Sequence, residues 1–174
     1  MNVPRRHRPL YVLAVVMCVT VGAPRSAAAQ VERNGRALAV VAGPFQYDLS
    51  GTGTSVFGAA RLELPLGAFA VIEPGLTVGR YDAQFGSTVT LLFPEIQLQL
   101  QGRGAMSPYL GVGAGPAFAF SEGRSDSEVF LSTALGLRFR ARSGWGVRGE
   151  LRIRAIDPFA GTTAEWGLGI SRRL

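Results

Sequence analysis

Hydrophobic and polar residues alternate along most of this chain, and the segment 145–154 shows the pattern best. Its even positions from 148 to 154 are all charged, whereas its odd positions carry apolar residues or glycine. Successive side chains of a β-strand point to opposite faces of the sheet. The segment therefore predicts a strand with one charged face and one apolar face.

Similar alternation recurs along the chain at regular intervals, separated by connections rich in Gly, Ser, Asp and Pro. Many short strands with turn residues between them are typical of a β-sandwich or β-barrel. Most of these segments have about ten residues or more, the length that a tilted transmembrane strand requires. The first segment has no clear register. The predicted strands are 36–47, 54–65, 68–81, 87–101, 107–120, 128–141, 145–156 and 163–172.

The predicted connections alternate between short and long. Short ones lie at 65–67, 102–106 and 142–144, and longer polar ones at 48–53, 82–86, 121–127 and 157–162. Short turns at one end and longer loops at the other are typical of an eight-stranded outer-membrane barrel with both termini on the periplasmic side. Gln30 and Leu174 would then lie at the same end.

Alternation does not say which face is inside, because a soluble lipocalin-like barrel has the same pattern with its apolar residues inward. Glycines on the charged face favour a charged lumen, since eight strands leave room for little more than side chains. The polar face also lacks lysine, a common residue of solvated surfaces. The glycines are Gly75, Gly79, Gly111, Gly113, Gly115, Gly136, Gly146, Gly167 and Gly169.

Aromatic residues near the strand ends favour the same arrangement, because membrane barrels carry aromatic girdles at both interfaces. We therefore expect the apolar face to contact lipid. The girdle candidates are Tyr47, Phe69, Tyr81, Tyr109, Phe120, Trp145, Phe159 and Trp166.

Residues 1–29 have the features of a secretory signal peptide. A basic start is followed by an apolar run from Leu10 to Ala23, which is too short to span a bilayer as a helix. An Ala-x-Ala site precedes Gln30. We expect cleavage after Ala29, which leaves one domain, 30–174.

Removal of this leader changes the charge and the available chemistry. The full chain has 18 basic and 12 acidic residues, and loss of four leader arginines reduces the net charge from +6 to +2. No basic run remains that would predict nucleic-acid binding. The only cysteine and histidine, Cys18 and His7, are also removed. Cys/His zinc sites and Ser–His–Asp or Cys–His catalysis are therefore excluded, whereas carboxylate chemistry is not.

Nucleotide-binding motifs are also absent. The glycine-rich segment 111–115 fits no GxGxxG register, and Pro116 stands where a helix would have to begin. A phosphate-binding loop would need a lysine, and the chain has none. We expect no cofactor, no metal site and no catalytic residue.

The charged face would form the lumen, with nearly equal numbers of arginines and glutamates. Opposite charges in a narrow space should pair, because an unpaired buried charge costs several kcal/mol. An ion-paired, closed lumen is the preferred interpretation, and a small ion pathway or gate is the alternative. The residues are Arg61, Glu63, Glu73, Glu95, Arg138, Arg140, Arg148, Glu150, Arg152, Arg154 and Glu165.

Four aspartates, Asp48, Asp82, Asp126 and Asp157, each fall in a different long connection at one end of the barrel. Asp is common in turns because its side chain accepts hydrogen bonds from nearby backbone. The alternative is that these carboxylates share divalent cations with lipopolysaccharide phosphates.

Segment 108–115 (PYLGVGAG), the alternating strands and the signal peptide together resemble the small outer-membrane β-barrel proteins, which include the OmpA barrel domain and OmpX-like proteins. The resemblance covers nearly all of 30–174. It implies an outer-membrane location in a Gram-negative-type bacterium, contact with outer-membrane lipid and lipopolysaccharide, and assembly by the barrel-assembly machinery and periplasmic chaperones. The last strand of such proteins usually ends in an aromatic residue, whereas this chain ends in Leu174.

The sequence therefore predicts an all-β protein, an eight-stranded antiparallel up-and-down transmembrane barrel. We expect a non-enzymatic role in envelope structure or surface interaction. The alternatives are a soluble secreted barrel that binds a small apolar ligand, a narrow transport pore and, last, a lipid-modifying enzyme. Barrel enzymes of that kind depend on a catalytic histidine, which 30–174 lacks.

Overall fold

The computed structural model describes residues 35–48, 53–82, 88–121, 124–156 and 161–174. The predicted signal peptide, its cleavage site and Asp157 lie outside these residues. The described chain forms eight strands, most of them within two residues of the predicted bounds. They are β1 (Ala37–Asp48), β2 (Gly53–Pro65), β3 (Ala70–Asp82), β4 (Thr88–Gln101), β5 (Met106–Ser121), β6 (Arg124–Arg140), β7 (Trp145–Ile156) and β8 (Gly161–Arg173).

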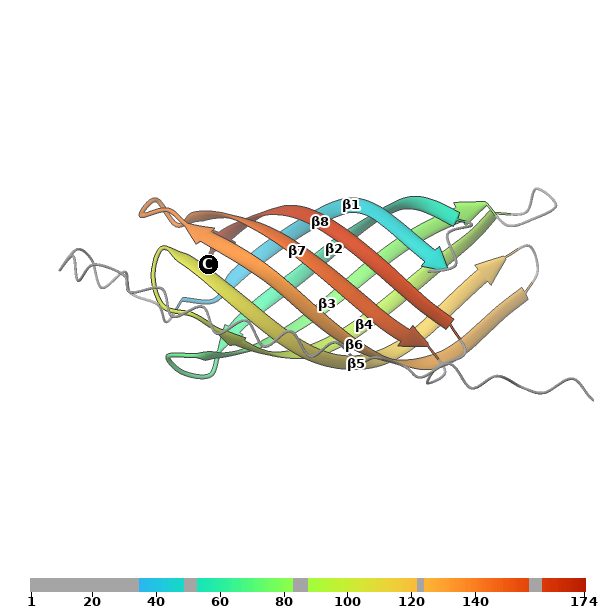
Figure 1. The fold of residues 1–174 in the computed structure, drawn as a ribbon, viewed down its shortest axis with the longest axis horizontal. Coiled ribbons are helices and arrows are strands. Elements are labelled where there is room, and N and C mark those ends of the chain that lie inside the picture. Colours follow the sequence, from blue (N-terminus) through green and yellow to red (C-terminus); the bar gives the residue numbers. More distant parts are fainter. Residues whose placement is uncertain (1–34, 49–52, 83–87, 122–123, 157–160) are drawn as a thin grey trace, which may run out of the picture.

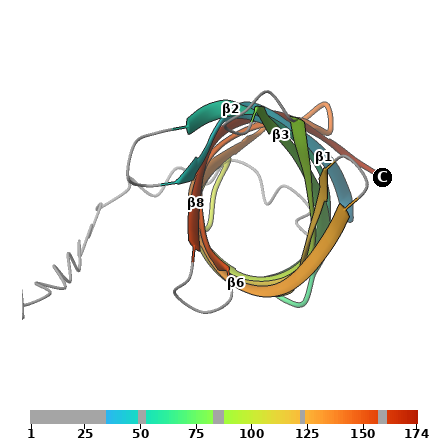
Figure 2. The same cartoon turned by 90° about the vertical axis from the view of Figure 1, so that its right-hand side faces the viewer.

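Each strand pairs with its sequence neighbours in antiparallel orientation, and β1 also pairs with β8. This pairing closes the sheet into an up-and-down barrel, with the strands tilted around its axis (Figure 1). Seen along the barrel, the strands form a complete ring (Figure 2). The fold class predicted from the sequence is confirmed.

The two ends of the barrel differ in their connections. Residues 66–69, 102–105 and 141–144 form the short turns at one end, which we call the turn end. Gly144 has a φ of 83°, a left-handed conformation that glycine adopts without a steric cost. Both ends of the described chain also lie there, because the Leu174 amide donates to the Arg36 carbonyl at 2.9 Å. We call the opposite end the loop end.

The strands β5 and β6 extend further toward the loop end than expected. Residues 121–127 were predicted to be a loop, but Ser121 pairs with Arg124 and Ala119 pairs with Asp126. The prediction was wrong because polar side chains do not prevent backbone pairing when both faces of the hairpin are exposed to solvent. Residues 124–129 are all exposed.

The apolar face of the barrel points outward, and the charged face points inward. Leu98, Leu110, Leu135 and Leu168 are all exposed, whereas Arg61 and Glu73 are buried. This orientation contradicts the lipocalin-like alternative, in which the apolar residues would fill the interior. In the described residues no helix is long and apolar enough to cross a membrane.

Candidate functional site

The lumen contains all eleven charged residues that the sequence assigned to it. Each arginine lies within 4 Å of at least one glutamate, and the contacts join the eleven side chains into one connected network. Six of the eight strands contribute to it: β2, β3, β4, β6, β7 and β8. All of these residues are buried except Arg140, whose side chain is one quarter exposed.

Glu73 of β3 is a centre of this network. Its carboxylate lies 2.8 Å from the guanidinium groups of both Arg138 and Arg148, and 3.4 Å from that of Arg152. The side-chain amide of Gln99 also donates to it at 2.8 Å. One carboxylate therefore balances charge from two neighbouring strands, β6 and β7, across the barrel.

Glu150 of β7 is a second centre, on the side of the lumen that faces β2. It lies 2.8 Å from Arg61 and 2.7 Å from Arg148. The hydroxyl of Tyr109 donates to it at 2.7 Å and lies 2.9 Å from the Arg148 guanidinium, which donates to that hydroxyl. Tyr109 thus connects an arginine and a glutamate by hydrogen bonds.

The other glutamates extend the network toward both ends of the barrel. Toward the turn end, Glu63 lies 3.1 Å from Arg138 and 2.8 Å from Arg140. Toward the loop end, Glu95 lies 2.6 Å from Arg152 and 3.0 Å from Arg154. Arg154 in turn is ion-paired with Glu165.

Uncharged polar side chains complete the network, and sequence analysis placed none of them in the site. The arginines outnumber the glutamates by one, and glutamine carbonyl groups accept hydrogen bonds from them. Thr77 shares the parity of Glu73, the glutamines share that of Glu95, and Ser132 shares that of Arg138, which is the signal that could have identified them. The residues are Thr77, Gln97, Gln99, Gln101, Tyr109 and Ser132.

Small residues make room for these side chains, as the glycine pattern predicted. A Cβ atom at Gly113 would lie 2.7 Å from the Glu95 carboxylate, and one at Gly111 would lie 2.6 Å from the Gln97 side chain. At Gly136 it would lie 2.4 Å from the Tyr109 ring. The inward-facing glycines therefore set how closely the charged side chains can pack.

The loop-end half of the lumen is apolar, which the sequence analysis did not predict. Phe93 packs against Phe130 with ring centroids 5.5 Å apart and an interplanar angle of 89°. Arg154 separates the two halves, since its guanidinium lies 4.7 Å from the Phe93 ring centroid. We call this group the aromatic core. It consists of Val41, Phe45, Phe57, Ala59, Leu91, Phe93, Ala117 and Phe130.

Three of the predicted girdle aromatics face the lumen, so their assignment to the membrane interface was wrong. Tyr109 is buried in the ion-pair network, and Tyr47 and Tyr81 stack with centroids 3.9 Å apart beside the aromatic core. A position near a strand end does not determine whether a side chain points into the lumen or outward. That is determined by whether the residue is at an odd or an even position along the strand. Phe69, Phe120 and Trp145 are exposed near strand ends. Trp166 is also exposed, but it pairs with Leu151 in the middle of β7, so its assignment to a strand end was wrong. Phe159 lies outside the described residues.

The loop-end aspartates do not come together in the part of the chain that the structure describes. Asp48 and Asp82 are the last residues of β1 and β3, rather than loop residues, and Asp126 lies within β6. The Asp82 carboxylate accepts a hydrogen bond from Thr88 across the connection, at 3.1 Å. Among the described residues no group of three acidic, His or Cys side chains could hold a metal ion.

Comparison with protein-family models and with curated proteins finds no match. Solved structures, by contrast, match over most of the chain. The neisserial surface protein A barrel superposes with a TM-score of 0.69 at 10% identity, covering 81% of this chain and 97% of that one. The chain has the fold of the small outer-membrane β-barrels.

Two further solved structures share this fold. The Ail protein of Yersinia pestis gives a TM-score of 0.53 at 15% identity, with 81% of this chain and 99% of that one covered. The N-terminal β-barrel domain of OprF from Pseudomonas aeruginosa gives 0.51 at 13% identity, with 79% and 97% covered. The fold expected from the resemblance to OmpA-like and OmpX-like proteins is therefore confirmed.

Proposed function

We propose that this chain is an integral outer-membrane protein whose closed barrel serves envelope structure or surface interaction, without catalysis. The observation that carries the proposal is the division of the barrel into an outer apolar surface and a lumen filled by paired charges and aromatic side chains. An apolar outer surface of this extent is stable in lipid and unfavourable in water. In the proposal, residues 1–29 direct export.

The contents of the lumen support a structural role for the charged residues. Five glutamates and six arginines contact one another, and the aromatic core fills the lumen beyond Arg154. An ion pathway would require these contacts to separate, and an unpaired buried charge costs several kcal/mol. We therefore assign the network to register and stability rather than to transport.

The absence of His and Cys from 30–174 supports a non-enzymatic role, because it removes the usual nucleophiles and bases of barrel enzymes. Lipid and lipopolysaccharide would be the partners in the membrane. The barrel-assembly machinery and periplasmic chaperones would act during biogenesis.

Membrane fractionation combined with a heat-modifiability gel tests the location. We expect the protein to sediment with outer membranes and, when it is not boiled, to migrate at a different apparent mass, because the folded barrel resists the detergent. Recovery in the soluble periplasmic fraction with no heat-dependent shift would contradict the proposal.

For Asp82 we propose a turn-stabilising role, which the hydrogen bond from Thr88 supports, and for the loop-end carboxylates as a set we propose no shared cation. Calcium or magnesium should then leave the melting temperature of the folded protein unchanged, with or without lipopolysaccharide. A rise that requires both the cation and lipopolysaccharide would favour the cation-sharing alternative.

A further inference from the structure

The two ends of the barrel differ in charge as well as in connections. Among the described residues, the turn end has five arginines besides those of the lumen network, and its only acidic side chain, Glu63, belongs to that network. The loop end carries both signs, with Arg80 and Arg124 beside Asp82, Asp126 and Glu128. The turn-end arginines are Arg36, Arg103, Arg142, Arg172 and Arg173.

Arg172 of β8 lies on the outer surface at the turn end. It is exposed and stands between Leu38 of β1 and Trp145 of β7 in the strand pairing. Its guanidinium lies 5.1 Å from the centroid of the Trp145 ring. Tryptophan prefers the membrane interface, and arginine binds phosphate oxygens in a bidentate manner. The pair therefore has the composition of a headgroup site.

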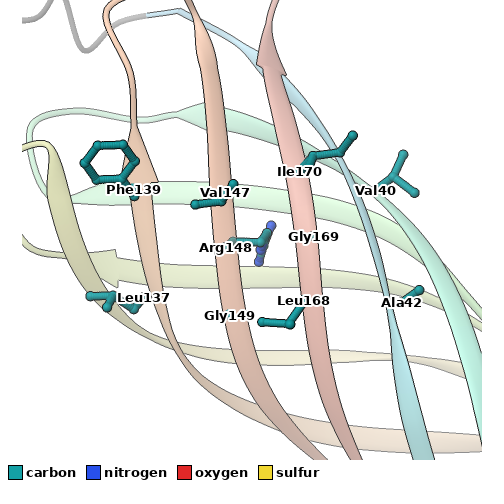
Figure 3. Close-up of a pocket in the computed structure, with 10 residues that line it drawn as sticks. All are labelled: Val40, Ala42, Leu137, Phe139, Val147, Arg148, Gly149, Leu168, Gly169 and Ile170. Carbon is teal, nitrogen blue, oxygen red and sulfur yellow. The ribbon is translucent and has the colours of Figure 1, made fainter.

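An apolar hollow of about 560 Å³ begins next to this pair. The part of the hollow nearest to this pair is formed by Val147 and Ile170. These two residues pair with each other, and they lie two residues along their strands from Trp145 and Arg172, respectively. Two residues further, Gly149 of β7 lies between Leu137 and Leu168. Figure 3 shows that these two side chains flank a position where Gly149 contributes no side chain.

The hollow is open to the lipid side and is not part of the lumen. The guanidinium group of Arg148, one of the residues that line the hollow, points away from it to Glu73 and Glu150 in the lumen. From Arg172 to the level of Gly149 the strand advances four residues, roughly 13 Å. That length suits an acyl chain that descends from a headgroup at the turn end.

We propose that Arg172, Trp145 and this hollow form a binding site for an anionic glycerophospholipid of the leaflet at the turn end. Arg172 binds the phosphate, and one acyl chain lies over Gly149 between Leu137 and Leu168. The excess of arginine at this end favours a net-negative headgroup over a zwitterionic one. The site rests on the proposed membrane location.

Native mass spectrometry of the folded barrel in a non-ionic detergent tests this site. Phosphatidylglycerol and phosphatidylcholine are titrated separately, and bound lipid is counted. We expect phosphatidylglycerol to bind in preference. Arg172→Gln should weaken it about tenfold, the loss of one charge-assisted contact. Gly149→Leu should weaken both lipids by filling the hollow; a Cβ there meets only Leu168, at 3.6 Å, so the barrel accommodates it.

Two control variants test whether the effect is local. Arg103→Gln removes an arginine of the same end, which lies 4.0 Å from the Phe69 ring centroid. Ala114→Leu adds a side chain to the exposed face of β5, away from the hollow. Both controls should bind phosphatidylglycerol as the unchanged protein does. The proposal would be overturned if Arg103→Gln and Arg172→Gln weakened phosphatidylglycerol binding equally, or if the unchanged protein bound the two lipids equally. It would also be overturned if the protein formed a dimer that Gly149→Leu abolished.

The heat-modifiability gel, run on each variant, separates this inference from the proposed function. If the unchanged protein and the variants all show the shifted band of a folded barrel, but none binds phosphatidylglycerol in preference, the lipid site alone is overturned. Loss of the shifted band in the unchanged protein would instead contradict the membrane barrel itself.

Discussion

The ring of Tyr109 occupies the space that a side chain at Gly136 would fill. These residues face each other on β5 and β6, and a Cβ atom at position 136 would lie 2.4 Å from the Tyr109 ring. The hydroxyl group of the same tyrosine donates to Glu150, and the Arg138 guanidinium lies 4.2 Å from its ring centroid. Because Gly136 has no side chain, Tyr109 can lie where it contacts both a glutamate and an arginine.

This relationship predicts that Gly136→Ala destabilises the barrel. The methyl group would push Tyr109 away from Glu150, and overpacking of this kind costs about 1–3 kcal/mol. Gly58→Ala is the matched control, because a Cβ atom at that outward position meets nothing within 4 Å. Urea unfolding in lipid vesicles, followed by gel shift, measures both. Equal stability of the two variants would show that Tyr109 is not confined by Gly136.

Removal of one lumen carboxylate should lower the free energy of unfolding more than removal of any single surface charge. Glu73→Gln leaves six arginines facing four glutamates, and it removes the partner shared by Arg138, Arg148 and Arg152. We expect a loss of about 3–5 kcal/mol in the free energy of unfolding, the usual effect of breaking a buried ion pair.

The control for this variant is Glu128→Gln, which removes an exposed carboxylate of β6. Its free energy of unfolding should change by about 0.5 kcal/mol or less, as is usual for surface positions. If Glu73→Gln unfolded at the same urea concentration as Glu128→Gln, the lumen network would have no role in stability.

Much of the barrel could be predicted from the sequence because one face of most strands is charged and the other is aliphatic. In β7, the positions of Arg148, Arg152 and Arg154 predict which face points into the lumen, and the structure has all three side chains buried. In β1 the same reasoning failed, because both faces are apolar. Ala39, Val41 and Phe45 point inward, while Leu38 and Val40 point outward.

The contents of the loop-end half of the lumen were missed for a related reason. Leu91 and Phe93 share the parity of Glu95, and Phe130 shares that of Arg138, so parity alone placed them inside. They were missed because apolar residues were assumed to face lipid. Residues that contact each other across the barrel, such as Glu73 and Arg148, lie on strands far apart in the sequence, and no local pattern specifies such a contact.

The two tryptophans provide a test of the lipid-facing surface. Trp166 is exposed on the outer surface opposite Leu151, six residues from Arg172 along β8, roughly 20 Å. With strands tilted by about 40° and a hydrocarbon core about 30 Å thick, Trp166 should lie near the bilayer centre. Trp145 should lie near the headgroups at the turn end.

Fluorescence quenching in vesicles of brominated lipids measures this depth. In Trp145→Phe, the remaining Trp166 should be quenched most by bromine near the ends of the acyl chains. In Trp166→Phe, the remaining Trp145 should be quenched most by bromine near the headgroups. Identical quenching profiles for the two variants would contradict the placement of the outer surface in lipid.

Planar bilayer recording of the purified protein tests the central claim, a lumen closed by paired charges and the aromatic core. We predict no steady conductance above the baseline of the bilayer, under conditions in which a water-filled porin conducts. The heat-dependent gel shift of the same preparation shows that folded barrels were added. A steady, large conductance that appears in steps as barrels insert would contradict the closed lumen.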